Sequence, residues 1–216
     1  MSEHGTITTD NHAALWHGRF LEGPDAAAVT FETSIRDDMR MAMVDIEGSI
    51  NHAKMLCKTN LISKDEEKQI VDGLNSIKND LLATKDKEGK EFKVDMSAED
   101  IHSFIEATLT DRIGEAGKKV HTGRSRNDQI ALDERLYLRH QINMLKTEIN
   151  NMISVLVNIA KENKETLIPG FTHMQHAQPV TLAHHVLAWA WMFYRDYDRL
   201  TDAYKRADVS PIGACA

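Results

Sequence analysis

QIALDERLYLRHQINMLKTEINNMISVLVNIAKEN, residues 129–163, is the stretch that decides the fold. It contains neither glycine nor proline, and its apolar residues recur at three- and four-residue steps, which is the period of an α-helix. At a rise of about 1.5 Å per residue, such a helix is about 50 Å long, far longer than the average globular helix. The apolar stripe consists of Leu132, Leu136, Ile142, Leu145, Ile149, Met152, Leu156 and Ile159.

A second long helix is predicted farther along the chain. Pro169 and Gly170 end the first run, and Pro179 suits the first turn of a helix that continues through Leu187 to Tyr204. Long helices of this kind need neighbours along their whole apolar stripe, and within this chain each has essentially only the other. Further chain, further subunits or both are therefore expected to cover them.

Three shorter helices are predicted upstream by the same period, over residues 35–56, 70–81 and 101–109. Ser63 followed by Glu66 has the spacing of a capping box before the second of them. No run has the two-residue period of a strand, and no internal repeat is found. The predicted fold is all-α, with a mixed helical amino-terminal domain followed by the first long helices of a central helical bundle.

These patterns divide the chain into three predicted segments. Residues 1–14 are polar and without periodicity, which is typical of a flexible tail. Residues 15–125 are predicted to form the helical amino-terminal domain, which includes a charged, solvated loop over residues 84–94. Residues 126–216 are predicted to form a partial central helical-bundle domain.

The bulk composition narrows the class of protein. A net charge of −7 and an isoelectric point near 5.9 argue against nucleic acid or a membrane surface as a partner, since either needs a dominant basic face. The sequence has no basic leader and no apolar run long enough to span a bilayer, so a cytoplasmic protein is expected. Cys57 and Cys215 lie far apart and predict neither a disulfide framework nor a zinc site.

KKVHTGRSRNDQ, residues 118–129, is the first candidate site. Four cationic side chains and no acid lie between Lys118 and Asn127, immediately before a long helix whose N-terminal amides also favour anions. A local anion site in an acidic protein is one interpretation, and a solvated basic loop is the other. Asn127 and Asp128 can also serve simply as helix caps.

PGFTHMQHAQP, residues 169–179, is the second candidate site. It presents a hydroxyl, an imidazole and amides in a tight loop, from which His173 can act as an acid or a base near neutral pH. A single loop histidine is nevertheless more often structural. The pairs His173 with His176 and His184 with His185 favour no metal, because no carboxylate or thiol completes a ligand set.

Two further positions gain meaning only from their context. EDIH, residues 99–102, begins a predicted helix and is most simply a cap formed by Asp100 with a surface histidine at His102. Ser34 is most simply the N-cap of the helix over residues 35–56.

Taken together, these segments resemble the argininosuccinate lyase family of the fumarase/aspartase superfamily in their order and approximate spacing. The HTGRSRNDQ run is specific to this branch, whereas the Thr-His loop alone is typical of the whole superfamily. The resemblance covers nearly all of residues 16–216. It rests on WHGRF (16–20), EDIH (99–102), HTGRSRNDQ (121–129), PGFTH (169–173) with QP (178–179), and SPIG (210–213).

The resemblance implies a reversible β-elimination that splits argininosuccinate into arginine and fumarate, as in arginine biosynthesis and the urea cycle, without a metal or an organic cofactor. Removal of a proton beside a carboxylate builds negative charge there, and fixed donors lower that barrier. The implied substrate-binding residues are Ser34, His102, Arg124, Arg126, Asn127, Thr172 and Gln175, and the implied acid/base residue is His173.

The resemblance also implies a homotetramer whose long helices pool into a central bundle and whose active sites borrow segments from three subunits. The family's second proton-transfer group is a serine in a Gly-Ser-Ser-x-Met-Pro loop, which these residues lack, so a truncated chain that is inactive by itself is expected. His17 and His176 stand where the family usually has glycine and arginine. Two alternatives stay open: a sister reaction of the adenylosuccinate, fumarate or aspartate type, and a non-catalytic crystallin-like or partner protein on the same fold.

Overall fold

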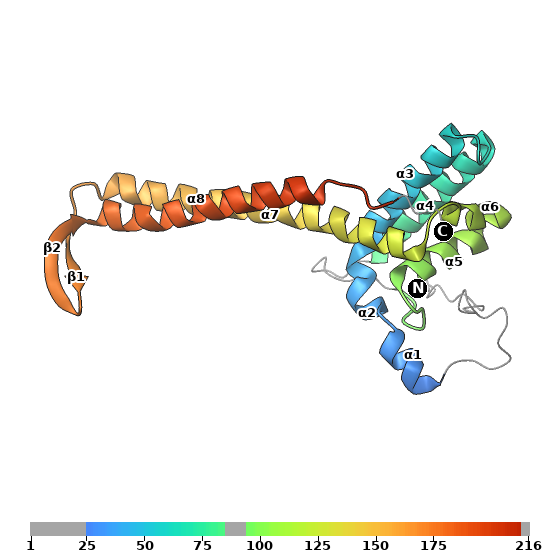
Figure 1. Ribbon diagram of the computed structural model, residues 1–216, viewed down its shortest axis with the longest axis horizontal. Helices are drawn as coiled ribbons and strands as arrows, with labels where there is room; N and C mark the ends of the chain where they lie inside the picture. The colour runs from blue at the N-terminus through green and yellow to red at the C-terminus, as the bar shows by residue number, and fades with distance from the viewer. Residues whose placement is uncertain (1–24, 85–93, 213–216) are drawn as a thin grey trace, which may run out of the picture. The chain divides into compact units, whose positions relative to one another are not determined.

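The computed structural model describes residues 25–84 and 94–212, and these residues form two units (Figure 1). One unit contains the described residues up to Glu134 together with Pro211 and Ile212, and the other contains Arg135–Ser210. The division falls inside one long helix, on the carboxyl side of the boundary predicted at residue 125. The tail predicted over residues 1–14, the WHGRF motif and most of the loop predicted over residues 84–94 lie outside the described residues.

The first unit is built from helices that surround one hydrophobic core (Figure 1). Its elements are α1 (Ala26–Glu32), α2 (Ile35–Asp38), η2 (Met39–Met41), α3 (Ala42–Lys58), α4 (Lys64–Thr84), α5 (Ile101–Ile113), α6 (Glu115–Lys118), η3 (Lys119–His121) and the start of α7 (Arg126–Glu162). Fully buried side chains from α3, α4 and α5 fill the core. The largest of them are Ile46, Leu56, Ile70, Leu74, Ile77, Leu81, Ile101, Phe104 and Leu109.

Local capping chemistry explains where two of these helices begin. The backbone N–H of Ser63 donates to Glu66 Oε2 at 2.8 Å and the N–H of Glu66 donates to Ser63 Oγ at 3.2 Å, which confirms the predicted capping box at the start of α4. At α5 the carboxylate of Asp100 accepts the N–H of Ser103 at 2.6 Å, so Asp100 is the N-cap.

The helix predicted over residues 35–56 is interrupted. It consists of α2, a 3₁₀ turn and α3, and Ser34 makes no side-chain cap to the backbone of α2. Ser34 Oγ instead donates to Asp38 Oδ2 at 2.6 Å, while Asp38 Oδ1 accepts the N–H of Ile101 at 3.1 Å. The side chain of Asp38 therefore fixes the end of α2 against the start of α5.

Two short helices, α6 and η3, occupy the segment between Gly114 and Gly123. The first of them, α6, packs tightly against α5: a Cβ placed on Gly117 would lie 2.8 Å from the Cα of Thr110. Gly114 and Gly123 have φ values of 67° and 69°, where glycine is favoured because it lacks a Cβ. The three glycines therefore allow the chain to turn twice within a few residues and to enter α7.

The second unit contains the rest of α7, a β-hairpin and α8 (Leu182–Ala207), and Figure 1 shows the two helices side by side. The hairpin consists of β1 (Leu167–Thr172) and β2 (Gln175–Thr181), paired antiparallel. The sequence predicted no strand, and it placed Pro179 in the first turn of the second long helix; both predictions are wrong. Pro179 pairs with Pro169 in the hairpin, where a proline is tolerated because both strands are edge strands. The helix begins only at Leu182. Thr181 is its N-cap, because Thr181 Oγ1 accepts the N–H of His184.

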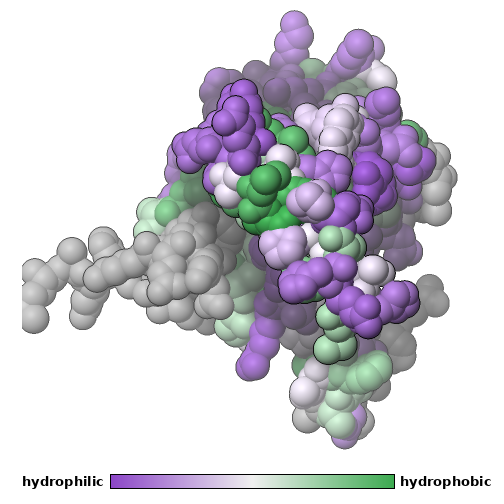
Figure 2. All heavy atoms as spheres, turned by 90° about the vertical axis from the view of Figure 1, so that its left-hand side faces the viewer, coloured by the Kyte–Doolittle hydropathy of each residue, from purple (hydrophilic) through white to green (hydrophobic). Residues whose placement is uncertain are grey.

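Apolar side chains remain exposed on both long helices of the second unit. Leu156 of α7 packs on Val186 and Ala190 of α8 in a small buried cluster, which covers only part of the two stripes. On the face drawn in Figure 2, hydrophobic side chains lie exposed among hydrophilic ones. The large exposed apolar residues of the two helices are Leu138, Met144, Leu145, Met152, Val155, Ile159, Trp189, Trp191, Met192 and Tyr194. Among the described residues, no helix combines the length and the apolar character needed to cross a bilayer.

Candidate active site

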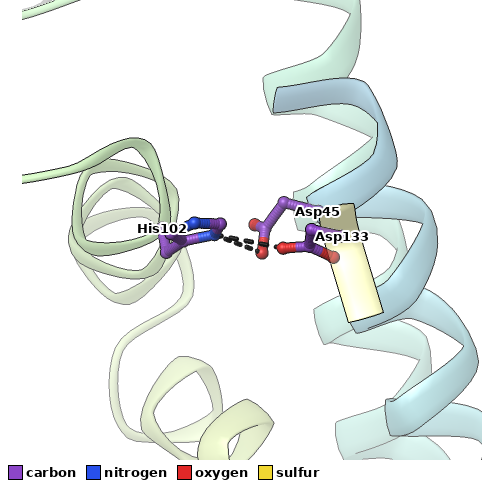
Figure 3. Close-up of side chains that lie close together, drawn as sticks. All are labelled: Asp45, His102 and Asp133. Carbon is purple, nitrogen blue, oxygen red and sulfur yellow. Dashed lines mark hydrogen bonds and ion pairs between the residues drawn. The ribbon is translucent and has the colours of Figure 1, made fainter. Parts of the chain in front are cut away.

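Three charged side chains from three helices meet inside the first unit (Figure 3). Asp45 comes from α3, His102 from α5 and Asp133 from α7, and each is about 1% exposed. Nδ1 of His102 lies 3.1 Å from Asp45 Oδ1 and 3.1 Å from Asp133 Oδ2. These three residues are called the buried cluster below.

The geometry of the buried cluster decides how it is ionised. Burial opposes a charged imidazole, but the hydrogen bonds to Asp133 and Asp45 outweigh it and raise the pKa of His102 to about 10. The single N–H on Nδ1 can make a well-aligned hydrogen bond to only one of the two carboxylates at a time. Burial would raise the pKa of Asp45, but the hydrogen bond and charge of His102 lower it, so Asp45 carries the negative charge. Burial and the neighbouring charge of Asp45 raise the pKa of Asp133 to about 7, against the hydrogen bond from His102.

A buried arginine lies close to this cluster. Arg124 is 3% exposed, and its Nη2 donates to Ser49 Oγ at 2.9 Å. Its Nε and Nη1 atoms are buried without a hydrogen-bond partner among the described residues. Burial lowers the pKa of Arg124, and the charges of Asp45 and Asp133 oppose that shift. The two positive groups, Arg124 and His102, can therefore balance the two carboxylates without any further ion.

The candidate anion loop, residues 121–127, lies within the first candidate site (118–129) and is held in place by His52 of α3. His52 is buried, and burial keeps its pKa below the usual value despite the hydrogen bond to Thr122. Its Nε2 donates to the Thr122 carbonyl at 2.8 Å. Where the loop enters α7, the N–H of Ser125 donates to Asp128 Oδ2 at 3.2 Å, so Asp128 does act as a capping residue.

Arg126 is the partly accessible cation of this loop. Its side chain is 20% exposed, and Nη2 donates to Glu106 Oε2 at 3.0 Å. The same carboxylate lies 3.3 Å from His121 Nδ1. Burial would raise the pKa of Glu106, but the bond from His121 and the charge of Arg126 lower it, so Glu106 is ionised. Asn127 follows in the first turn of α7 with an exposed side chain, while its backbone N–H donates to Ser125 Oγ at 3.2 Å.

Ser34 and the segment containing His102 are brought together by the first unit. The N–H of Ser34 donates to the carbonyl of Glu99 at 2.9 Å, and Asp38 links Ser34 to Ile101. Ser34 is half-buried, whereas the imidazole of His102 points into the protein. The interpretation of His102 as a surface residue is therefore wrong, because the two carboxylates hold it inside.

The hairpin of the second unit carries Thr172, His173 and Gln175, which are all exposed. Thr172 pairs with Gln175, and the two residues between them, His173 and Met174, have φ values of 47° and 64°. Positive φ at both central positions is the mark of a type I′ turn, for which Asn-Gly is the usual sequence. His173 is thus presented to solvent at the tip of a tight turn with a left-handed backbone.

Asp45, Asp133 and Gln129 were not singled out by the sequence as functional residues. One signal was available: Asp45, Ser49 and His52 recur at helical spacing within the apolar face of α3 and form a short polar stripe. Nothing in the sequence shows which other segments that stripe meets.

Metal binding has one geometric candidate among the described residues. One donor atom from each of Asp45, His102 and Asp133 lies within 4.8 Å of the others. These side chains suit a metal poorly while His102 is charged, because Nδ1 then carries a proton and has no free lone pair. The histidines first considered for a metal, His173, His176, His184 and His185, all lie in the second unit. That the protein uses no metal stays a prediction.

Comparison with known proteins places this chain among the lyases. The pattern of the Lyase family matches residues 18–216, and the chain belongs to that family. An argininosuccinate lyase of Clostridium perfringens is 53% identical over 202 residues, which is 94% of this chain and 42% of the relative. An argininosuccinate lyase of Hahella chejuensis is 46% identical over 209 residues, 97% of this chain and 43% of the relative. The chain therefore spans less than half the length of these relatives.

Solved structures agree on the fold. A variant of EDDS lyase with bound fumarate has a TM-score of 0.67 and 26% identity, covering 81% of this chain and 33% of that one. A fumarate lyase from Mesorhizobium sp. BNC1 has a TM-score of 0.65 and 21% identity, covering 85% and 41%. The predicted helical lyase fold is confirmed, although the sequence did not predict the hairpin.

Proposed function

We propose that the complete gene product is an argininosuccinate lyase, which splits argininosuccinate reversibly into arginine and fumarate in arginine biosynthesis. The 53% identity to an argininosuccinate lyase carries the proposal, because it extends over 94% of the chain and includes both candidate sites. In this proposal the protein works in the cytoplasm, and the reaction needs no metal or organic cofactor.

The chemistry of the first unit supports an elimination beside a carboxylate. Loss of the proton spreads negative charge onto that carboxylate, and donors already fixed in place lower the barrier. The side chains of Arg126 and Asn127, at the start of α7, supply such donors. We assign the succinyl part of the substrate to these side chains.

Not all of the implied substrate contacts receive the same role. Arg124 is 3% exposed and His102 is 1% exposed, so we assign both to the support of the loop from inside. Ser34 is half-buried and keeps its proposed role as a substrate contact. On the hairpin, Thr172 and Gln175 are proposed contacts and His173 is the proposed proton-transfer group, which fits their exposure.

Fumarate release tests the proposal directly. The purified complete gene product is expected to release fumarate from argininosuccinate, both with and without a chelator. The ultraviolet absorbance of fumarate measures the release. The 216-residue chain alone is expected to release far less, unless it is co-expressed with the remaining part of the Clostridium perfringens relative. If the complete product instead releases fumarate only from another succinyl compound, the family assignment stands and the substrate assignment falls.

Self-association is the second expectation. Large apolar side chains lie exposed along both α7 and α8, and a homotetramer that pools these helices would bury them. We expect sedimentation of the 216-residue chain to show oligomers or aggregates, and replacement of Met144 and Trp191 by glutamate to reduce the sedimentation coefficient. A monodisperse monomer of the unchanged chain would contradict the proposed assembly.

A further inference from the structure

One side chain connects the buried cluster to the accessible arginine. Gln129 is 2% exposed and lies one turn after Arg126 on α7. Its Nε2 donates to Asp45 Oδ1 at 2.5 Å, and its Oε1 accepts from Arg126 Nη1 at 2.7 Å. The connection therefore runs from His102 through Asp45 and Gln129 to Arg126.

The chemistry of the two partners fixes the orientation of the Gln129 amide. A carboxylate such as Asp45 accepts hydrogen bonds, and a guanidinium such as that of Arg126 only donates them. The amide nitrogen must therefore face Asp45 and the amide oxygen must face Arg126, since a flipped amide would lose both bonds. The amide offers this donor and this acceptor at once on one planar group.

We propose that Gln129 is a positioning residue that ties the guanidinium of Arg126 to the buried cluster and so sets the direction from which Arg126 meets an anionic substrate. The inference rests on the proposed function, in which Arg126 binds the succinyl carboxylates. Glu106 holds Nη2 of the same guanidinium and Gln129 holds Nη1, so the two acceptors fix the plane of the group. These two bonds use two of the five N–H donors of the guanidinium, and we assign the others to the ligand.

Gln129→Met tests this role because methionine keeps the length of the side chain and removes both bonds. In the complete gene product, the KM for argininosuccinate and the inhibition constant of fumarate are expected to rise roughly tenfold, since a misplaced binding group weakens each contact that it makes. The turnover number kcat is expected to fall by a smaller factor. Gln141→Met, a half-buried glutamine on the same helix in the second unit, is the matched control and is expected to leave both constants unchanged.

A purely structural role would give a different result. If the variant only lost folded protein, the apparent kcat would fall in proportion to the folded fraction. KM and the inhibition constant would stay unchanged, because only the folded molecules determine them. Gln129→Glu supplies a second variant: it keeps the acceptor for Arg126, loses the donor to Asp45, and is also expected to raise both constants. Unchanged constants in both variants, or the failure of both to fold, would overturn the proposal.

The positioning role and the proposed function can fail separately. If the unchanged gene product releases no fumarate from argininosuccinate, the proposed function fails. Calorimetric binding of fumarate then tests the positioning role, and Gln129→Met is expected to weaken that binding by the same factor. Equal fumarate affinity of the unchanged protein and the Met variant would overturn the positioning role alone.

Discussion

Replacement of His173 in the complete gene product is expected to lower kcat by roughly 100- to 10,000-fold, the usual contribution of a positioned acid or base, while KM changes little. His173 is exposed at the tip of the hairpin, where it is free to meet a substrate. His173→Asn is the better variant, because asparagine tolerates the φ of 47° found there and alanine does not. Steady-state kinetics of fumarate release measures both constants.

Two comparisons make the His173 result specific. His173→Ala removes the same imidazole but strains the turn. Any additional loss of kcat relative to His173→Asn therefore measures the effect of backbone strain in the turn. His140→Ala, an exposed histidine on α7, is expected to leave kcat unchanged. A His173→Asn variant that turns over at the unchanged rate would remove His173 from the mechanism.

His102→Gln is expected to lower the free energy of unfolding by about 3–5 kcal/mol, which is the cost of leaving a buried charge without its partner. The two carboxylates would keep their burial and lose the imidazolium that both of them contact. Chemical denaturation followed by circular dichroism measures the loss. The double variant His102→Gln with Asp133→Asn removes one of the stranded carboxylates, so it is expected to lose less than His102→Gln alone. A double variant that is less stable than the single one would contradict this account of the cluster.

The same cluster predicts how stability depends on pH. Folding raises the pKa of His102 from 6.5 to about 10, so its contribution is complete below pH 6.5 and is lost as the pH rises through about 10. Asp133 acts in the same direction, because folding raises its pKa from 3.8 to about 7 and its contribution is lost as the pH rises through about 7. The free energy of unfolding is therefore expected to fall between pH 3.8 and about 7 through Asp133 and between pH 6.5 and about 10 through His102, and the fall above pH 7 is expected to be less steep in His102→Gln.

The parts of the fold that follow from neighbouring residues could be predicted from the sequence. The period of residues 129–163 predicted α7, which spans Arg126–Glu162, and the spacing of Ser63 and Glu66 predicted the start of α4. The hairpin could not be predicted in this way, because its turn places His173 and Met174 at positive φ instead of Asn and Gly. Its residues form strands through pairing across the turn.

The candidate site was only partly predictable for a related reason. The anion loop is contiguous in sequence, so its charges were visible at once. The buried cluster joins residues that are 57 positions apart in the case of Asp45 and His102, and only the packing of α3, α5 and α7 brings them into contact. Arg124 and Arg126 look alike in sequence, yet one is buried on Ser49 and the other remains accessible.

The three separate origins of the buried cluster also bear on the order in which the first unit folds. Each of the three helices brings one ionisable group that is costly to remove from water until its partners arrive. Docking α3 against α7 without α5 would bring the two carboxylates together without the imidazolium, so this partly assembled state gains little. Docking of α5 then supplies the imidazolium and removes that penalty. The cluster thereby makes the folding transition of the first unit more cooperative, because it penalises the intermediates that a purely apolar interface would tolerate.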